Sequence, residues 1–233
     1  MKDLALLTDF YQLSMMQGYF FTKPYQTAVF DVFYRKNPSG GGYAIFCGLS
    51  EVVDYIENLK FSDDDIAYLK SLNLFKPEFL EFLRGFKFSG EIYAMDEGQI
   101  VFPHEPLIRV KANIMEAQLI ETAILNTINF QTLIATKSSR INFSAQGDSV
   151  MEFGLRRAQG RSAGIYGAKA AIIGGCSATS NVLAAKKFDV PAIGTHSHSW
   201  IQSFDSELEA FRAYAKIYPN STLLLVDTYD TLA

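Results

Sequence analysis

The sequence predicts an α/β protein with an N-terminal α/β domain over residues 1–114 and the first part of a β/α barrel over residues 115–233. Two observations carry this prediction. After Met115, short apolar segments alternate with helical segments, which is typical of parallel β/α units. Functional side chains also follow these apolar segments one after another, as they do at the face of a β/α barrel that holds the active site. A doubly wound sheet would give a similar pattern over a few units and stays open as an alternative.

Composition and charge exclude several classes of protein. The chain has 233 residues, of which 48% are hydrophobic and 20% charged, so it is globular rather than disordered. A net charge of −4 and the absence of long basic runs argue against a nucleic-acid-binding surface. Cys47 and Cys176 are far apart, which favours neither a disulfide framework nor a zinc ribbon. The isolated cysteines also favour a cytoplasmic location. Asp3 and Asp9 interrupt the N-terminal apolar residues, so we expect no signal peptide, and no apolar run is long enough for a membrane span.

The N-terminal region begins with a predicted helix over residues 4–21, where apolar side chains recur on one helical face. Two strands are predicted next, over residues 27–36 and 43–49, joined by the glycine loop at residues 37–42. A glycine loop can cradle phosphate, but this one lacks the Gly-Lys-Ser/Thr ending. A turn is therefore favoured.

Residues 49–84 are predicted to be helical. Ser62 and the three aspartates after it are typical of a helix cap rather than of a metal site, and Pro77 opens a further helix. Residues 89–112 change to short strands separated by Gly98, Pro103 and Pro106, and His104 is expected in the loop between the two prolines.

The C-terminal region alternates strands and helices. The predicted elements are a long helix over residues 116–133, a strand at VMEFG, a helix near 162–173, a strand at GGCSA, a helix near 179–188, a strand at VPAIGT, a helix near 206–218 and a strand at TLLLVD. From Met115 to the last residue the chain supplies about half of the ~250 residues that a complete barrel needs. The TLLLVD strand would then leave an exposed edge.

Functional groups are expected just beyond the strand ends. They are Phe153 with Arg156 and Arg157, then Ser177, then Thr195 with His198, then Asp227. A strand covered by helices on both faces cannot readily carry polar groups along its length, so they collect beyond its carboxyl end. Two of the three histidines, His196 and His198, lie in the segment VPAIGTHSHSW. A polar turn in which one histidine satisfies backbone groups remains an alternative, as does a two-histidine metal site, although no third ligand is evident nearby.

Several longer motifs, in this order, resemble the N-terminal half of the nicotinate phosphoribosyltransferases, which are type II phosphoribosyltransferases. The motifs are LLTDFYQLSMMQGY, NPSGGGYAIFCGL, EFGLRRAQG, GGCSATSN, VPAIGTHSHSW and LLLVDTYDT. The resemblance covers the whole chain. It implies an irregular β/α barrel joined to an α/β domain that is built from the N-terminal region and part of the C-terminal half.

The resemblance implies a substrate site shared between subunits. Tyr11 matches a tyrosine that a neighbouring subunit stacks on the pyridine ring, and Asp9 accompanies it. Phe153 would cover the other face of the ring, and Arg156 and Arg157 would meet phosphate oxygens. From the residues alone, a core tyrosine, a core phenylalanine and solvated arginines are the alternatives.

The resemblance also implies roles near the strand ends. Thr195 matches a nicotinate-contacting threonine and His198 matches the histidine that ATP phosphorylates. Asp227 and Asp230 resemble acidic residues near magnesium and the ribose. The further candidates are Lys137 and Arg140 as phosphate-binding residues, and Ser177, which stands where many relatives have an aspartate.

The implied activity is the ATP-coupled transfer of a phosphoribosyl group from phosphoribosyl pyrophosphate to nicotinate, in NAD biosynthesis. The implied partners are these substrates, magnesium, a second copy of the chain in a homodimer and, if the enzyme is divided, a second chain that completes the barrel. Two alternatives stay open: a relative specific for nicotinamide or quinolinate, and a non-catalytic half.

Overall fold

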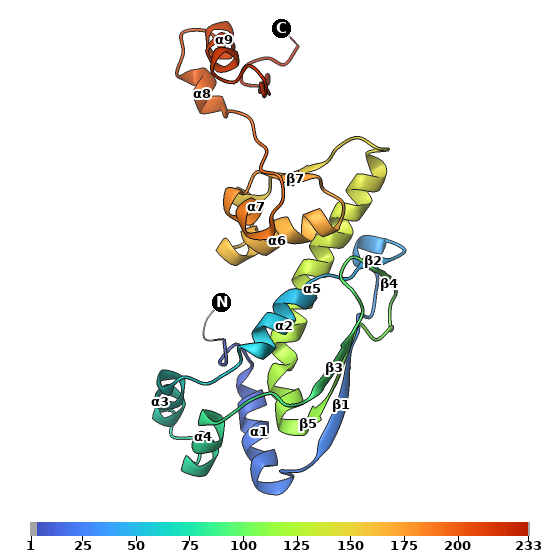
Figure 1. Cartoon of the computed structure of the whole chain (residues 1–233), viewed down its shortest axis with the longest axis vertical. Coiled ribbons are helices and arrows are strands. Elements are labelled where there is room, and N and C mark those ends of the chain that lie inside the picture. Colours follow the sequence, from blue (N-terminus) through green and yellow to red (C-terminus); the bar gives the residue numbers. More distant parts are fainter. Residues whose placement is uncertain (1–3, 233) are drawn as a thin grey trace.

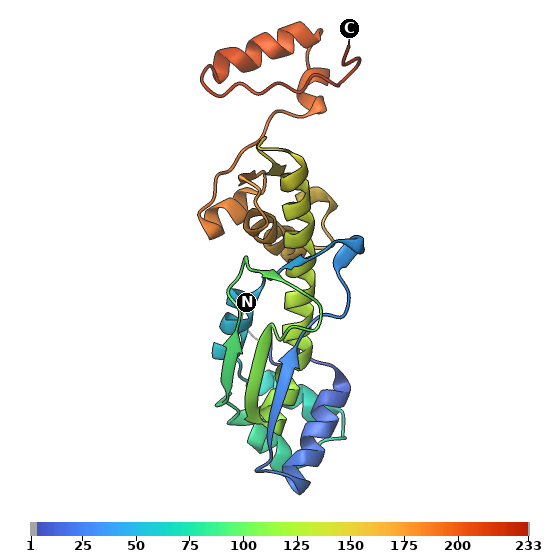
Figure 2. The ribbon, with the colours of Figure 1, turned by 90° about the vertical axis from the view of Figure 1, so that its right-hand side faces the viewer.

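One long helix, α5 (Ile114–Ser144), runs through the molecule and contacts both of its parts (Figures 1 and 2). The computed structural model describes residues 4–232. Asn113 caps α5 by accepting the backbone N–H of Met115 at 3.0 Å, which satisfies one of the free donors of the first turn. The helix is 31 residues long, so it extends beyond the predicted residue 133 and includes Lys137 and Arg140.

A three-stranded antiparallel sheet forms the N-terminal part, in the order β1 (Thr27–Val32), β5 (Ile108–Asn113) and β3 (Glu91–Ala94). Side chains of β5 alternate between buried and exposed, as expected for a sheet covered on one face. Helix α1 (Phe10–Thr22) and the first half of α5 lie alongside it (Figure 1). Two short strands, β2 (Ala44–Ile45) and β4 (Ile100–Val101), form a separate antiparallel pair, and β2 follows the glycine loop in sequence.

Three short helices confirm the helical prediction for residues 49–84. They are α2 (Leu49–Glu57), α3 (Asp63–Ser71) and α4 (Pro77–Arg84). Ser62 and Asp65 form a reciprocal capping box at the start of α3, and Pro77 is the first residue of α4, where its missing N–H costs nothing. The acidic residues after Ser62 therefore belong to a helix cap.

The bounds of three predicted elements in the N-terminal region differ in the structure. Helix α1 begins at Phe10 rather than Leu4, because residues 4–8 form a turn in which Leu7 N–H donates to the Leu4 carbonyl at 3.0 Å. The two strands joined by the glycine loop are present but shorter than predicted, and they lie in different sheets, since β1 pairs with β5 and β2 pairs with β4. The loop itself contains a 3₁₀ turn at Pro38–Gly40.

Parallel strands separated by helices follow α5. Strand β6 (Met151–Glu152) pairs in parallel with β7 (Ala178–Thr179), and Thr179 forms a parallel bridge to Ala192. The connecting segments are the 3₁₀ turn η2 (Leu155–Arg157), α6 (Arg161–Ile173) and α7 (Val182–Phe188). This is the start of a β/α arrangement, and the predicted α/β fold class is confirmed.

The last part, α8 (His198–Gln202) and α9 (Glu207–Ile217), lies at the end of the molecule farthest from α1 (Figures 1 and 2). The prediction of α9 is confirmed. The TLLLVD segment is extended but forms no strand among the described residues, because no neighbouring strand lies beside it to accept its hydrogen bonds. VPAIGT contributes only the bridge at Ala192.

Helix α5 contributes to the packing of both parts. Its first half supplies buried residues to the core beneath the sheet, whereas Ala135 lies in a second small cluster with Ala170 of α6. The domain boundary at residues 114/115 stays a prediction. Within the described residues, even α5 has no stretch that is apolar and long enough to cross a bilayer.

Candidate active site

The segment that carries both histidines lies against the extended residues 222–228. The Thr195 hydroxyl donates a hydrogen bond to the Leu223 carbonyl at 2.6 Å, and the Leu225 N–H donates to Nε2 of His196 at 3.3 Å. These long-range contacts bring the THSH sequence and the DTYD sequence together.

His196 and His198 have different environments. His196 is buried and packs edge-on against Tyr214, with ring centroids 4.8 Å apart. Since its Nε2 accepts a backbone N–H, Nδ1 carries the proton and faces the Ser197 carbonyl at 3.4 Å. The His198 side chain is 49% exposed at the start of α8. The polar atoms of His196 are therefore bound to the backbone, whereas His198 is exposed to a ligand.

Polar groups surround the His198 ring. Nε2 lies 4.0 Å from Oδ1 of Asp227, and Nδ1 lies 3.2 Å from the Thr228 hydroxyl. The hydrogen bond with Thr228 gives the imidazole a defined orientation, which a nucleophile or a general base requires, and the Asp227 carboxylate lies near the other ring nitrogen. Asp230 follows in the same loop and accepts the Leu232 N–H at 2.9 Å. We call Thr195, His198, Asp227 and Thr228 the histidine group.

Tyr11 lies in a different cavity, of about 580 Å³, between the start of α1, the end of β1 and one face of α5. The Tyr11 side chain is 52% exposed. The charged residues that line this Tyr11 cavity are Asp9, Arg35 and Glu121. Aromatic and charged groups in one cavity suit a ligand that has both a ring and an ionic group.

The Tyr11 phenol has two acidic neighbours. Partial desolvation raises its pKa, and the negative charges of Asp9 and Glu121 raise it further. Asp9 is held in place because its Oδ2 accepts the hydroxyl hydrogen of Thr122 on α5 at 3.0 Å.

Arg157 and Lys137 line a third cavity, of about 530 Å³, with Glu152 and Gly154. Glu152 at the end of β6 accepts the Thr179 hydroxyl at 2.6 Å and also the backbone N–H of Gly154. Two cations from separate elements in one cavity form a suitable site for an anion. Phe153 is exposed after β6, and no hydrogen bond or ion pair joins Arg156 to the other candidates among the described residues.

Arg140 lies one turn after Lys137 on α5 and contacts the glycine loop. Its Nη1 donates to the Ser39 carbonyl at 3.3 Å, and both basic residues line a cavity of about 560 Å³ beside this loop. The turn predicted for the loop is confirmed, and its contact with Arg140 is an additional feature of it.

Ser177 does not lie where a strand-end residue should. It precedes β7, and its hydroxyl lies 2.6 Å from that of Ser149, which precedes β6. Because β6 and β7 are parallel, both serines are at the amino ends of the strands, whereas Phe153 follows a carboxyl end. The placement of Ser177 at a strand's carboxyl end was wrong. Ser180, whose N–H donates to the Glu152 carbonyl at 2.9 Å, has that place in β7.

The structure does not bring all predicted site residues together within one chain. Helices α1 and α8 lie toward opposite ends of the molecule in both views (Figures 1 and 2), so the Tyr11 cavity and the histidine group are far apart. The described residues contain no group of three or more His, Cys, Asp or Glu residues that could hold a metal ion.

A buried ionic cluster links the two parts of the fold. Lys169 of α6 binds Glu51 of α2 at 2.7 Å and Glu97 at 3.1 and 3.2 Å. Burial would raise the pKa of Glu97, but the Gly48 N–H and the Lys169 ammonium outweigh it and hold that pKa below its ordinary value. Each charge in this cluster has a protein partner, so the cluster is structural rather than a ligand site.

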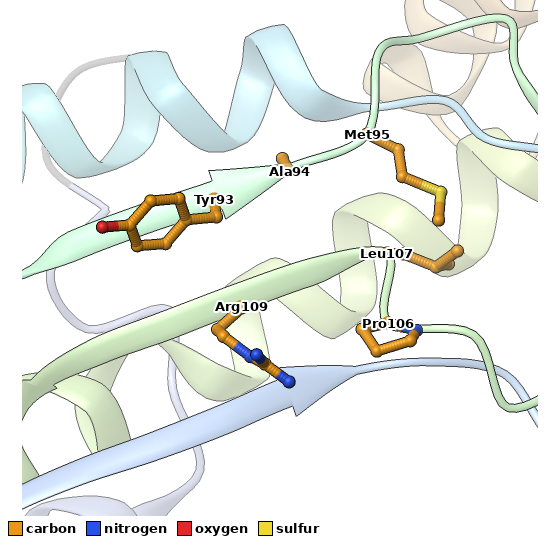
Figure 3. Close-up of a pocket in the computed structure, with 6 residues that line it drawn as sticks. All are labelled: Tyr93, Ala94, Met95, Pro106, Leu107 and Arg109. Carbon is orange, nitrogen blue, oxygen red and sulfur yellow. The ribbon is translucent and has the colours of Figure 1, made fainter.

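A hollow of about 470 Å³ also lies on the open face of the sheet (Figure 3). Its lining includes Tyr93 and Arg109, and none of the sequence-predicted residues. Arg109 is already paired with Asp31 through two hydrogen bonds of 2.7 and 2.9 Å. We therefore do not assign this hollow to the active site.

Sequence reasoning missed several polar residues of these cavities. Arg35 belongs to the Tyr11 cavity, and its signal is a basic residue directly after a strand in FYRK. Glu121 is in the middle of α5, where an acidic residue is ordinary, so only the tertiary contact reveals it. Thr228 follows Asp227 in a motif, but the motif did not indicate that its hydroxyl contacts His198.

Comparison with known proteins places these features in a family context. A model of the nicotinate phosphoribosyltransferase N-terminal domain matches residues 6–129, and a model of the nicotinate phosphoribosyltransferase family matches residues 149–233. A nicotinate phosphoribosyltransferase of Bacillus subtilis is 47% identical over 231 residues, covering 99% of this chain and 47% of the relative. One from Mycobacterium tuberculosis is 45% identical over 228 residues, covering 98% of this chain and 49% of the relative.

Solved structures give the same picture. The crystal structure of human nicotinic acid phosphoribosyltransferase is similar with a TM-score of 0.88 at 29% identity, covering 96% of this chain and 55% of that one. A nicotinate-nucleotide pyrophosphorylase from Pyrococcus furiosus shares the fold, with a TM-score of 0.79 at 24% identity over 97% of this chain and 51% of that one. The chain spans about half the length of the curated relatives it matches.

Proposed function

This chain belongs to the nicotinate phosphoribosyltransferase family, and from that premise we propose that it forms part of an enzyme that makes nicotinate mononucleotide. The reaction transfers a phosphoribosyl group from phosphoribosyl pyrophosphate to the ring nitrogen of nicotinate and releases pyrophosphate. It is a step of NAD biosynthesis. The activity belongs to an assembly that also supplies the rest of the family's length, in one polypeptide or as a second chain, which we call the complete enzyme.

The observation that best supports this proposal is the similarity to nicotinate phosphoribosyltransferases over nearly the whole chain. The motifs that carry the candidate residues lie inside the matched regions. The exposed ring of His198 beside Asp227 adds chemical support, because this pair has the groups that a phosphate-accepting imidazole needs.

We infer that His198 couples the reaction to ATP. One ring nitrogen attacks the γ-phosphorus, an N–P bond forms, the bond from that phosphorus to the bridging oxygen breaks, and ADP leaves. Water later breaks the N–P bond and releases inorganic phosphate. The Thr228 hydroxyl, 3.2 Å from Nδ1, would hold the ring while Nε2 reacts.

The remaining candidates bind substrate. Tyr11 and Phe153 would cover the two faces of the pyridine ring, and Thr195 would contact nicotinate. Arg157 and Lys137, which line one cavity, would bind phosphate oxygens, with Arg156 and Arg140 as neighbours. Asp227 and Asp230 would hold magnesium, because the Asp227 side chain is 56% exposed and this ion prefers few carboxylates together with phosphate oxygens. Bound magnesium would neutralise pyrophosphate charge.

We propose that two copies of the chain share each site. Helices α1 and α8 lie far apart in one chain (Figure 1), so the Tyr11 cavity at the start of α1 in one copy would cover the histidine group of another. This arrangement explains why a ring suited to stacking is half exposed in a single chain.

The proposal is tested by following radiolabelled nicotinate into nucleotide, with phosphoribosyl pyrophosphate, in the presence and absence of ATP. The complete enzyme is expected to form nicotinate mononucleotide, faster with ATP, and the isolated 233-residue chain is expected to form little or none. Nicotinamide and quinolinate are offered in parallel. Preference for either would replace the proposed substrate, and no transfer to any of the three by the complete enzyme would favour a non-catalytic role.

A further inference from the structure

Gln12, directly after Tyr11, is completely buried, whereas Tyr11 is half exposed. Glutamine is mostly found at protein surfaces, and a buried amide is costly unless its polar ends are hydrogen-bonded. The first turn of α1 therefore places one ring outward and one amide inward.

Both ends of the Gln12 amide bind α5. Its Nε2 donates to Oε2 of Glu121 at 2.7 Å, and its Oε1 accepts from Nε2 of Gln118. The same Gln118 nitrogen donates to Oε2 of Glu121 at 2.8 Å, so the three side chains form a closed set. We call this set the Gln12 clamp.

The residues before Tyr11 also bind α5. The Thr8 hydroxyl donates to the Leu119 carbonyl at 3.2 Å, and Asp9 accepts the Thr122 hydroxyl. Asp9 stands at the N-cap position of α1 but makes no side-chain cap bond there. Its carboxylate thus binds α5 instead of capping the start of α1.

Stability alone does not require such polar contacts. An apolar side chain of similar size at position 12 would bury as much surface, and replacing all partners of a buried polar contact by apolar groups is often nearly neutral. Directional hydrogen bonds instead define how the first turn of α1 is oriented on α5. Fixing a recognition side chain before binding reduces the entropy lost on binding.

We propose that Gln12, with Gln118 and Glu121, is a positioning residue that holds the first turn of α1 so that the Tyr11 ring points in one direction toward the pyridine ring of the substrate. The inference rests on the proposed function, because it assigns the stacking partner of Tyr11. Gln12 itself touches no substrate in this proposal.

The test uses Gln12→Met in the complete enzyme, which keeps the length of the side chain and removes both hydrogen bonds. The KM for nicotinate should rise about tenfold with kcat little changed, within the range that loss of a stacking contact allows. Gln131→Met is the matched control, because Gln131, on α5, is likewise a buried glutamine whose Nε2 donates to a glutamate, Glu51, at 2.9 Å. Its KM for nicotinate should stay within about twofold of the wild type. Gln118→Ala removes the hydrogen bond that Gln12 Oε1 accepts, and it replaces Gln12→Met in the test if that variant does not fold.

A second readout does not depend on catalysis. With 3-fluorotyrosine at position 11, the ¹⁹F resonance of the substrate-free enzyme should broaden or move in Gln12→Met and not in Gln131→Met. The double variant Tyr11→Ala with Gln12→Met should have the same KM as Tyr11→Ala alone, because Gln12 acts only through Tyr11. An unchanged resonance, or additive effects on KM, would overturn the positioning role. A wild-type enzyme without transferase activity would overturn the proposed function and leave the resonance test valid.

Discussion

At the residue scale, two histidines that are two positions apart in sequence have different environments. The ring of His196 is bound within the fold, because its Nε2 accepts a backbone N–H and the ring packs against Phe211 and Tyr214. The ring of His198 is exposed beside Asp227 and Thr228. Orientation, rather than intrinsic basicity, separates two imidazoles of similar nature.

We predict that His198→Ala abolishes labelling of the complete enzyme by γ-labelled ATP and leaves a slow transfer that does not need ATP. The label should be acid-labile and base-stable, as a phosphohistidine is. His196→Ala should keep the label and lower the thermal midpoint, because it leaves the Leu225 N–H without its acceptor. Label that survives in His198→Ala and disappears in His196→Ala would reverse the assignment.

Tyr11→Ala should weaken pyridine binding to the complete enzyme by about 1–3 kcal/mol, the range for stacking of a base on an aromatic side chain. Equilibrium dialysis with labelled nicotinate measures this change. Tyr25→Ala is the control, since Tyr25 is a tyrosine of the same region that is 94% exposed. Equal weakening by both substitutions would exclude a specific role for Tyr11.

At the scale of elements, close contacts place α6 on the rest of the fold. Gly174 ends α6 where a Cβ would collide with the Ala135 carbonyl of α5, so only glycine allows this approach. Lys169, one turn earlier, joins α6 to α2 through Glu51. The segment that carries Arg156 and Arg157 leads directly into α6, so this packing determines where those arginines lie.

Lys169→Met should destabilise the protein by about 3 kcal/mol, because it leaves two carboxylates of low exposure without their cation. Thermal or urea unfolding measures the loss. Lys111→Met is the matched control: Lys111 pairs with Glu91 at 3.5 Å, both side chains are about half exposed, and its loss should cost less than about 1 kcal/mol. Similar effects of the two substitutions would contradict the importance of burial.

The same cluster predicts an acid sensitivity. The pKa of Glu97 is lower in the folded state than its ordinary value, so its contribution is present above the ordinary pKa and disappears as the pH falls through the folded value. The wild type should therefore lose more stability than Glu97→Gln when the pH falls from 6 to below 4. Parallel loss in both proteins would show that Glu97 does not contribute. The pKa of Lys169 is raised, so its own contribution disappears only in alkali.

At the scale of the whole molecule, the Tyr11 cavity and the histidine group are separate sites within one chain. A mixed dimer tests whether they meet across copies. Tyr11→Ala and His198→Ala complete enzymes, each impaired alone, should recover part of the transfer activity when dissociated and reassembled together, because some dimers then contain one intact site. Mixing each variant with itself is the control. Activity no higher than that of either parent would exclude a shared site.

Most helices, and the starts of α3 and α4, could be predicted from the sequence, although α1 begins later and α5 ends later than predicted and α8 was not predicted. Ser62 with Asp65 and Pro77 identify helix starts because helical hydrogen bonds and caps join residues three or four positions apart. The motifs that indicate the family are likewise continuous stretches of sequence. These motifs indicate His198, Asp227 and Tyr11 as candidate site residues, and the roles of these residues stay predictions.

Strand pairing and contacts between residues distant in sequence could be seen only in the folded chain. TLLLVD has the composition of a buried strand but stays unpaired among the described residues, because a strand needs a neighbour that its own sequence does not contain. Ser177 lies at the amino end of β7 rather than at the predicted carboxyl end, because the residues that form β7 are those that pair with β6, and this pairing depends on two segments. Gln12 and Glu121 are 109 positions apart, and their contact exists because α1 packs against α5. Such contacts are non-local, so no local pattern encodes them.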